Sequence, residues 1–241
     1  MKNLNDKVAL ITGGTSGIGY GVALCLLNQG INVAVTSRDK SRAEEAAKKL
    51  VKESDSDARA IGVQADVRNL ESQKKAVSEV VSEFGQLDVV VANAGIGHFA
   101  SIENITEEQW KETIDTNLSG VFYAIKSSVE ELKKSKGYFI SISSLAGTNF
   151  FEGGSAYNAS KFGVTGFTQS VMLDLRKHNV KVSTIMPGSV STHFSGNEPD
   201  DSDAWKIQSE DIGQLVVDLL RMNERTLPSK IEVRPTMPAK S

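Results

Sequence analysis

A tyrosine and a lysine four residues apart, Tyr157 and Lys161, are the side chains in this sequence best suited to moving a proton. They lie at i and i+4 of a helical pattern, so they share one helix face. Lowering a tyrosine pKa from ~10 to ~7 requires ~4 kcal/mol in favour of the phenolate. One ammonium ~4 Å away supplies ~4 kcal/mol at an effective dielectric of ~20, and ~3 kcal/mol at ~6 Å. The pair is therefore energetically adequate for general acid–base chemistry.

The segment before this pair supplies its context, because a Tyr-x-x-x-Lys spacing alone is common on helix surfaces. Residues 139–144 form an apolar run that ends in hydroxyl side chains, the last of them Ser144. We predict a buried strand here, with Ser144 at its end and able to donate a hydrogen bond to a substrate oxygen. The alternative for this serine is a helix cap or a turn.

A glycine-rich stretch near the N-terminus has the spacing of a dinucleotide cradle. It follows an apolar run at residues 8–11 and opens a helical pattern. Glycine permits a tight turn and a close approach of a pyrophosphate, which the unpaired N–H groups of a helix N-terminus then attract. A tight turn without a ligand is the alternative, and the flanking strand and helix weigh against it. The cofactor-binding residues expected here are Gly13, Thr15, Ser16, Gly17, Ile18 and Gly19.

The loop after the second apolar run indicates which nicotinamide cofactor binds. An acidic residue there would accept from the ribose 2′-hydroxyl and repel a 2′-phosphate. Ser37 is not acidic, and Arg38 can bind a phosphate with both arms of its guanidinium. Lys40 and Arg42 are close by. Asp39 works against this interpretation, and a solvated loop charge is the alternative for Arg38. The sequence favours NADP(H), bound by Ser37 and Arg38, over NAD(H).

Short apolar runs alternate with longer helical patterns along the whole chain. The runs are rich in valine and isoleucine and do not alternate with polar residues, as expected for strands buried on both faces. We predict one α/β domain over residues 1–241, with a doubly wound, seven-stranded parallel Rossmann-type sheet and helices on both faces. The predicted strands are residues 8–12, 32–36, 60–65, 87–92, 138–143, 181–186 and 231–233, and the predicted helices are 17–29, 40–53, 69–84, 106–135, 155–178 and 209–222.

The glycine-rich stretch and the Ser144, Tyr157 and Lys161 side chains together resemble those of the short-chain dehydrogenase/reductase family. The resemblance extends from Lys7 to about Val233. Residues 12–19 match the family motif TGxxxGxG, and the other motifs follow in the same order along the chain. The remaining matches are Asp66-Val67, Asn93-Ala94-Gly95, Asn117, Ser144, Tyr157, Lys161, Pro187-Gly188 and Thr192.

The resemblance implies a role for each catalytic position. Tyr157 is the acid in reduction and the base in oxidation, and Ser144 orients the carbonyl and stabilises oxyanion charge. Lys161 lowers the tyrosine pKa and holds the nicotinamide ribose. Asn117, in a long central helix, holds a water that joins Lys161 to bulk solvent.

The resemblance also implies cofactor contacts beyond the glycine-rich stretch. An arginine-bearing second loop usually accompanies NADP(H) in this family. Some relatives carry a basic residue just before the second motif glycine, where this chain has Ser16. The contacts implied are Asp66 and Val67 beside the adenine, Asn93, Ala94 and Gly95 after the fourth strand, and Pro187, Gly188, Val190 and Thr192 at the nicotinamide.

Aromatic residues close to these motifs indicate an apolar or aromatic carbonyl substrate, with core packing as the alternative. The irregular segment 191–209 is the expected substrate loop, and its acidity disfavours anionic substrates and an acidic acyl-carrier protein. His98 could be a second acid, but a packing or surface role is favoured. The expected substrate residues are Ser144, Leu145, Phe150, Phe151, Tyr157 and Phe194, and further candidates are Ile96, Ala146 and Trp205.

Composition and charge argue against several other classes of protein. The net charge is −3 without a basic stripe, so no nucleic-acid partner is expected. No apolar run approaches a membrane span, and the three histidines lack metal-ligand spacing, so we expect neither a membrane partner nor a metal. The single cysteine, Cys25, cannot form an internal disulfide and fits a reducing, cytoplasmic setting.

The sequence thus favours an NADPH-dependent reductase of a ketone or other carbonyl. The enzymatic alternatives are a 3-oxoacyl-(acyl-carrier-protein) reductase and a dehydrogenase of an alcohol, sugar or steroid. A NADP(H)-bound sensor or scaffold is the non-enzymatic alternative. The resemblance favours a homotetramer or homodimer, and a small-residue stripe at Ala159, Gly163, Gly166 and Ser170 meets either a partner helix or another part of the chain.

Overall fold

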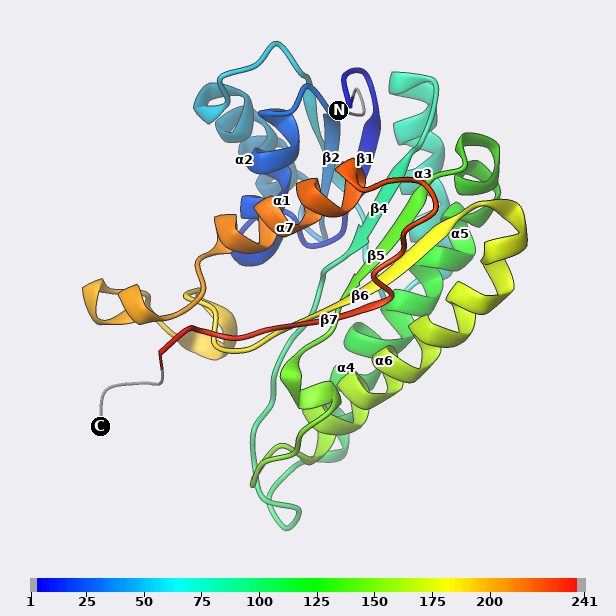
Figure 1. Ribbon diagram of the computed structural model, residues 1–241. Helices are drawn as coiled ribbons and strands as arrows, with labels where there is room; N and C mark the ends of the chain where they lie inside the picture. The colour runs from blue at the N-terminus through cyan, green and yellow to red at the C-terminus, as the bar shows by residue number, and fades with distance from the viewer. Residues whose placement is uncertain (1–3, 238–241) are drawn as a thin grey trace.

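The apolar runs form a parallel sheet in the computed structural model, which describes residues 4–237 (Figure 1). Within that range the sheet has seven strands in the order β3-β2-β1-β4-β5-β6-β7, and every pair is parallel. The predicted fold class is therefore confirmed. The strands are β1 (Val8–Ile11), β2 (Asn32–Ser37), β3 (Ala60–Gln64), β4 (Val89–Ala92), β5 (Tyr138–Ile142), β6 (Lys181–Pro187) and β7 (Lys230–Val233).

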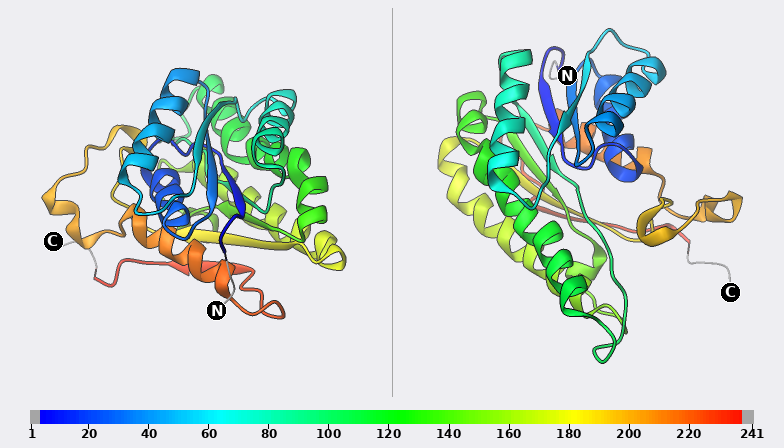
Figure 2. Two further views of the ribbon diagram at one scale, coloured as in Figure 1. Left: turned by 90° about the horizontal axis from the view of Figure 1, so that it is seen from above. Right: turned by 180° about the vertical axis from the view of Figure 1, so that it is seen from behind.

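Helices cover both faces of the sheet, as Figure 2 shows from above and from behind. Along β1, Ala9 and Ile11 join the core on one face, whereas Val8 and Leu10 join the core on the other. Successive side chains of a strand point to opposite faces, which is why these runs are apolar throughout. One face carries α1 (Gly17–Leu27), α2 (Lys40–Glu53) and α7 (Ser209–Arg221), and the other carries α3 (Leu70–Phe84), α5 (Gly120–Ser135) and α6 (Ser155–Leu175).

The long helix predicted over residues 106–135 is interrupted. The structure divides it into α4 (Glu107–Ile114), a π-helical turn (Asp115–Ser119) and α5. Asn117 lies in the turn, and its side chain accepts from the N–H of Ile96 and donates to the carbonyl of Ile96, both at 2.8 Å. Widened turns of this kind often occur at functional sites. The helix predicted over 155–178 likewise ends early, with a 3₁₀ turn after Leu175.

Hydrogen bonds join the ends of β1 and β4, where the strand order reverses. The buried hydroxyl of Thr12 accepts from the N–H groups of Asn93 and Ala94 at 3.0 and 3.1 Å. The Asn93 amide in turn donates to the carbonyls of Thr12 and Gly13. In doubly wound sheets a ligand binds at such a reversal. The two loops that meet there are therefore fixed by side chains as well as by the sheet.

We expect Thr12→Val to destabilise the protein by about 3 kcal/mol, because two N–H groups lose their acceptor at a buried position. Denaturant unfolding followed by circular dichroism measures the change. Thr12→Ser keeps the hydroxyl and should recover most of the stability. Equal losses for the two variants would contradict the role given to these hydrogen bonds.

Candidate active site

A cleft of about 710 Å³ runs along the carboxyl ends of the strands. It brings together twenty of the residues predicted to bind cofactor or substrate, from loops that follow six strands. Five others do not line it, namely Gly19, Asn117, Leu145, Phe150 and Phe151. Those that line it are Gly13, Thr15, Ser16, Gly17, Ile18, Ser37, Arg38, Asp66, Val67, Asn93, Ala94, Gly95, Ser144, Tyr157, Lys161, Pro187, Gly188, Val190, Thr192 and Phe194.

The glycine-rich turn brings the N-terminus of α1 to the cleft. Gly13 has a φ of +64°, and a Cβ there would lie 2.9 Å from the Cα of Ala94. Gly19 has a packing role instead, because a Cβ would lie 2.5 Å from the Asn93 amide nitrogen. Ser16 makes no side-chain cap, and the first turn of α1 has no acid. The first N–H groups of the helix therefore face the cleft in a positive field suited to an anion.

Arginines gather where β2 and β3 end. Arg38 and Arg42 both line the cleft, and the Arg38 carbonyl accepts from the Gln64 amide at 3.0 Å. The Asp39 carboxylate caps α2 by accepting from the N–H of Arg42 at 3.0 Å, and it does not line the cleft. The acid that argued against a bound phosphate is thus occupied as a helix cap.

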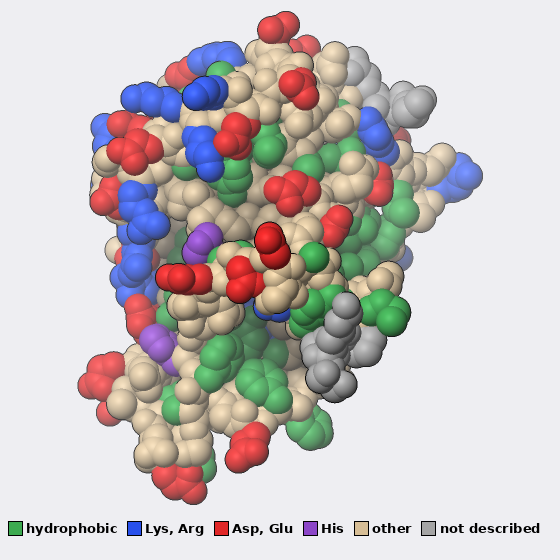
Figure 3. Space-filling model, turned by 90° about the vertical axis from the view of Figure 1, so that its left-hand side faces the viewer, with side chains coloured by type: hydrophobic (Ala, Val, Ile, Leu, Met, Phe, Trp, Pro, Cys, Tyr) green, Lys and Arg blue, Asp and Glu red, His purple; other side chains and the backbone are tan. Residues whose placement is uncertain are grey.

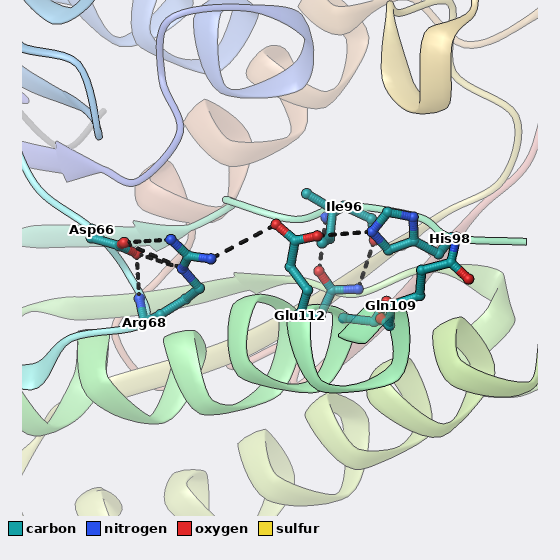
Figure 4. A network of polar contacts seen from close by, with 8 residues as sticks. Asp66, Arg68, Ile96, His98, Gln109 and Glu112 are labelled. Carbon is teal, nitrogen blue, oxygen red and sulfur yellow. Dashed lines mark hydrogen bonds and ion pairs between the residues drawn. The ribbon is translucent and has the colours of Figure 1, made fainter. Parts of the chain in front are cut away.

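A further arginine, Arg68, extends this positive end and was not predicted. It donates to the Asp66 carboxylate from its backbone N–H at 2.9 Å and from its guanidinium at 2.8 and 3.0 Å. These hydrogen bonds lower the pKa of Asp66. Arg68 also lies 3.7 Å from Glu112 of α4, and Glu112 contacts His98 at 3.0 Å (Figure 4). His98 thus contacts Glu112 and does not line the cleft, so its role stays the packing or surface one that the sequence favoured.

Tyr157 lies in the first turns of α6, beside Ser144 at the end of β5. Desolvation raises the pKa of the Tyr157 hydroxyl, and a hydrogen bond with Ser144 lowers it by less. The direction is opposite to the lowering expected from a neighbouring ammonium. Burial of the hydroxyl is the larger of the two causes and sets this direction. The phenol therefore remains protonated across the neutral range.

Lys161 is almost fully buried, with 4% of its surface exposed. Its ammonium donates to the carbonyl of Ile142 at 3.0 Å and lies 5.6 Å from the centroid of the Tyr157 ring. Burial lowers the pKa of Lys161 to about 8. The Asn117 amide donates to Ser160 at 3.0 Å, next to Lys161 in α6. The amide thus ties the π-helical turn to the helix that carries the tyrosine and the lysine.

Aromatic rings surround the phenol, including one that the sequence analysis missed. Phe99 lies 5.4 Å from the Tyr157 ring and 6.5 Å from Phe194, centroid to centroid. Phe151 joins the group through Phe99, at 5.7 Å, whereas Phe150 is 86% exposed. The position of Phe99 shortly after the Asn93-Ala94-Gly95 element was a usable signal. Among the further candidates, Ile96 lines the cleft, and His98, Ala146 and Trp205 do not.

No group of three or more His, Cys, Asp or Glu side chains is placed to hold a metal ion in residues 4–237. No helix there combines the length and the apolar character that crossing a bilayer requires.

Comparison with known proteins agrees with the fold. A family model described as short chain dehydrogenase matches residues 7–203. An uncharacterized oxidoreductase of Staphylococcus saprophyticus is 34% identical over 236 residues, 98% of this chain and 100% of the relative. A 3-oxoacyl-(acyl-carrier-protein) reductase of Staphylococcus aureus is 38% identical over 185 residues, 76% of this chain and 74% of the relative.

Solved structures share the whole arrangement of strands and helices. An alcohol dehydrogenase of the archaeon Thermococcus sibiricus, complexed with 5-hydroxy-NADP, superposes with a TM-score of 0.90. It is 28% identical, and the match covers 98% of this chain and 99% of that one. The family model spans most of the sequence, and a relative matches over its full length. The chain therefore belongs to the short-chain dehydrogenase family of oxidoreductases.

Proposed function

We propose that the protein reduces the carbonyl of a small apolar or aromatic ketone to a secondary alcohol with NADPH, reversibly. The observation that supports this most is the Tyr157 hydroxyl, which lines the cleft and is hydrogen-bonded with Ser144. The same cleft opens onto the N-terminus of α1. A proton donor and an anion-binding helix end thus share one cavity.

The residues of the cleft fit a bound dinucleotide. The uncapped start of α1 suits the pyrophosphate, and a side chain at Gly13 would collide with Ala94 and open the turn. Pro187, Gly188, Val190 and Thr192 would hold the nicotinamide end. The bound cofactor supplies a hydride equivalent, two electrons and one proton, to the carbonyl carbon.

Tyr157 completes the reduction by giving its proton to the carbonyl oxygen, while Ser144 donates a hydrogen bond to that oxygen. A phenol with a raised pKa is present in the acid form that reduction requires. The phenolate is then reprotonated from solvent, with the Lys161 ammonium beside the tyrosine ring and Asn117 bonded to the neighbouring Ser160. The net change is one carbonyl reduced, one NADPH oxidised and one proton consumed.

Arg38 and Arg42 support a preference for NADPH. Both line the cleft, and Asp39 is withdrawn as the cap of α2. Two guanidinium groups at the start of α2 suit a 2′-phosphate, which an acid at this position would repel. The structural relative from Thermococcus sibiricus binds an NADP derivative.

A second candidate reaction is the reduction of a 3-oxoacyl thioester, as in the Staphylococcus aureus relative. Against it stands the acidic segment with Glu198, Asp200 and Asp201, all exposed near the mouth of the cleft. An acidic carrier protein would be repelled there. Oxidation of an alcohol, sugar or steroid is the same reaction run in reverse. A sensor or scaffold that only binds NADP(H) would not require the proton donor Tyr157.

We further propose that the protein forms a homodimer or homotetramer. Phe122 of α5 and Phe162 and Leu173 of α6 are large apolar side chains that are 42–59% exposed. In the small-residue stripe of α6, Gly163 packs against Leu118 of the same chain, whereas nothing lies within 4 Å of a Cβ built on Gly166. Only part of the stripe is therefore packed against the same chain. The part at Gly166 is open, which supports packing of a helix from a partner subunit there.

Tyr157→Phe is expected to lower ketone reduction by NADPH at least ~100-fold, because the proton donor is removed. NADPH binding should remain close to normal. Steady-state absorbance of the reduced cofactor measures the first effect, and fluorescence titration measures the second. Tyr123→Phe, on α5 and away from the cleft, is the control. Near-normal turnover by Tyr157→Phe would refute the assignment.

Arg38→Ala is expected to weaken NADPH binding about 10- to 100-fold more than NADH binding, because a charged hydrogen bond to the 2′-phosphate is lost. Dissociation constants for both cofactors, measured by fluorescence at fixed ionic strength, give the ratio. Lys40→Ala removes the same charge from a residue outside the cleft and should leave the ratio unchanged. Equal weakening of both cofactors in Arg38→Ala would remove Arg38 from the phosphate site.

The low pKa of Lys161 predicts a pH-dependent stability. Its pKa is about 8 when folded and ~10.4 when unfolded, so between these values the unfolded chain binds more protons. The stability of the cofactor-free protein relative to Lys161→Met should therefore rise by about 2 kcal/mol from pH 7 to pH 10. Urea unfolding of both proteins at several pH values measures this difference. A difference that stays constant with pH would show that Lys161 titrates normally.

A further inference from the structure

Phe99, Phe151 and Phe194 come from three loops and meet beside the ring of Tyr157. Phe99 follows β4, Phe151 precedes α6, and Phe194 follows β6. The centroids of Phe99 and Phe194 lie 5.4 and 5.8 Å from that of Tyr157, and Phe151 lies 5.7 Å from Phe99. We call these three phenylalanines the aromatic wall. Loops far apart in the sequence thus place flat apolar surface next to the proton donor.

Much of the aromatic wall remains uncovered by the protein. Phe99 is 48% exposed and Phe151 is 47% exposed. Neither lines the cleft itself, but Phe99 packs against Tyr157 and Phe194, which do. Figure 3 shows hydrophobic side chains gathered below a row of acidic ones on this side of the molecule. Exposed aromatic surface beside a reactive group is available to an apolar part of a ligand.

The rings of the wall meet edge to face. The ring plane of Phe99 makes angles of 73° with Tyr157, 62° with Phe194 and 60° with Phe151. Aromatic rings prefer this arrangement because the positive edge of one ring faces the negative face of another. A flat aromatic ring can join such a cluster with the same geometry, which a branched alkyl chain lacks.

Gly97 sets the position of the wall. A Cβ on this residue would lie 2.7 Å from the hydroxyl of Ser195 and 2.8 Å from atoms of both Phe194 and Phe99. Ser195 also donates to the Gly97 carbonyl at 2.9 Å. Because Gly97 has no side chain, Phe99 and Phe194 can both pack against its backbone.

We propose that Phe99 determines substrate specificity by binding the flat ring of an aryl ketone, while the carbonyl group meets Tyr157 and Ser144. The inference rests on the proposed ketone reduction and narrows its substrate class. The ring of the ligand covers the exposed half of Phe99. Phe99 contributes to binding and takes no part in proton transfer.

Three ketones test this with NADPH as reductant: acetophenone, cyclohexyl methyl ketone and 3-pentanone. In Phe99→Ala, kcat/KM for acetophenone should fall about 10-fold, mainly through KM, and that for 3-pentanone should change less than ~2-fold. The cyclohexyl ketone, whose ring is not flat, should fall between them. Ile102→Ala, a 73% exposed apolar residue in the same loop, is the control.

Equal losses for all three ketones would overturn the proposal, because Phe99 would then only position Tyr157. Gly97→Ala separates Phe99 from Phe194 without removing a ring, and it should show the same selectivity if Phe99→Ala fails to fold. Phe99→Tyr should retain the preference for acetophenone.

Binding gives a readout that does not depend on turnover. Calorimetry of acetophenone added to the enzyme with NADP⁺, which cannot reduce it, should give a dissociation constant about 10-fold higher in Phe99→Ala than in the wild type. An unchanged constant would refute the aryl site. A wild-type enzyme that binds acetophenone through Phe99 but reduces no ketone would refute the proposed function and leave the binding site supported.

Discussion

The buried ammonium of Lys161 is the constraint on which the rest of the active site depends. Desolvation lowers its pKa to about 8, so its charged form costs free energy that suitable partners must offset. The Ile142 carbonyl and the face of the Tyr157 ring are the partners in this structure. The end of β5 and the start of α6 must therefore stay together, and the same contact holds Tyr157 beside Ser144. The proton transfer that we propose for Tyr157 would therefore take place beside a lysine that is costly to bury.

The cleft combines two environments along one edge of the sheet. At one end, Arg38, Arg42 and Arg68 create a positive region that Asp66 and Glu112 partly balance. At the other end, phenylalanine rings surround the phenol. The first favours a highly charged ligand and the second an apolar one, which suits a phosphorylated cofactor and the ketone substrate that we propose. The positive end lies at β2 and β3, and the aromatic end lies at β5 and β6. Strands β1 and β4, where the strand order reverses, lie between these two ends of the cleft.

The sequence was sufficient for most of the architecture and for the residues of the cleft. Strands buried on both faces leave a strong signal, and Tyr157, Lys161 and Ser144 follow elements of clear periodicity. Phe99 follows the Asn93-Ala94-Gly95 element closely, but its contacts with Tyr157 and Phe194 join segments far apart in the sequence and were missed. The ion pair between Arg68 and Asp66 is local, and it too was missed. The raised pKa of Tyr157 was also unpredicted, because spacing gives the distance between charges but not the water that surrounds them.

The π-helical turn at residues 115–119 has a geometric consequence for the helices on either side. An extra residue in one turn advances the helical phase by about 100°. The side of α4 that carries Glu112 can therefore face the cleft, while Val121 and Ala124 of α5 face the sheet. A continuous helix would keep a single phase from end to end. Deleting one residue from the turn would thus rotate α5 relative to α4, and the two helices could no longer serve the cleft and the core at once.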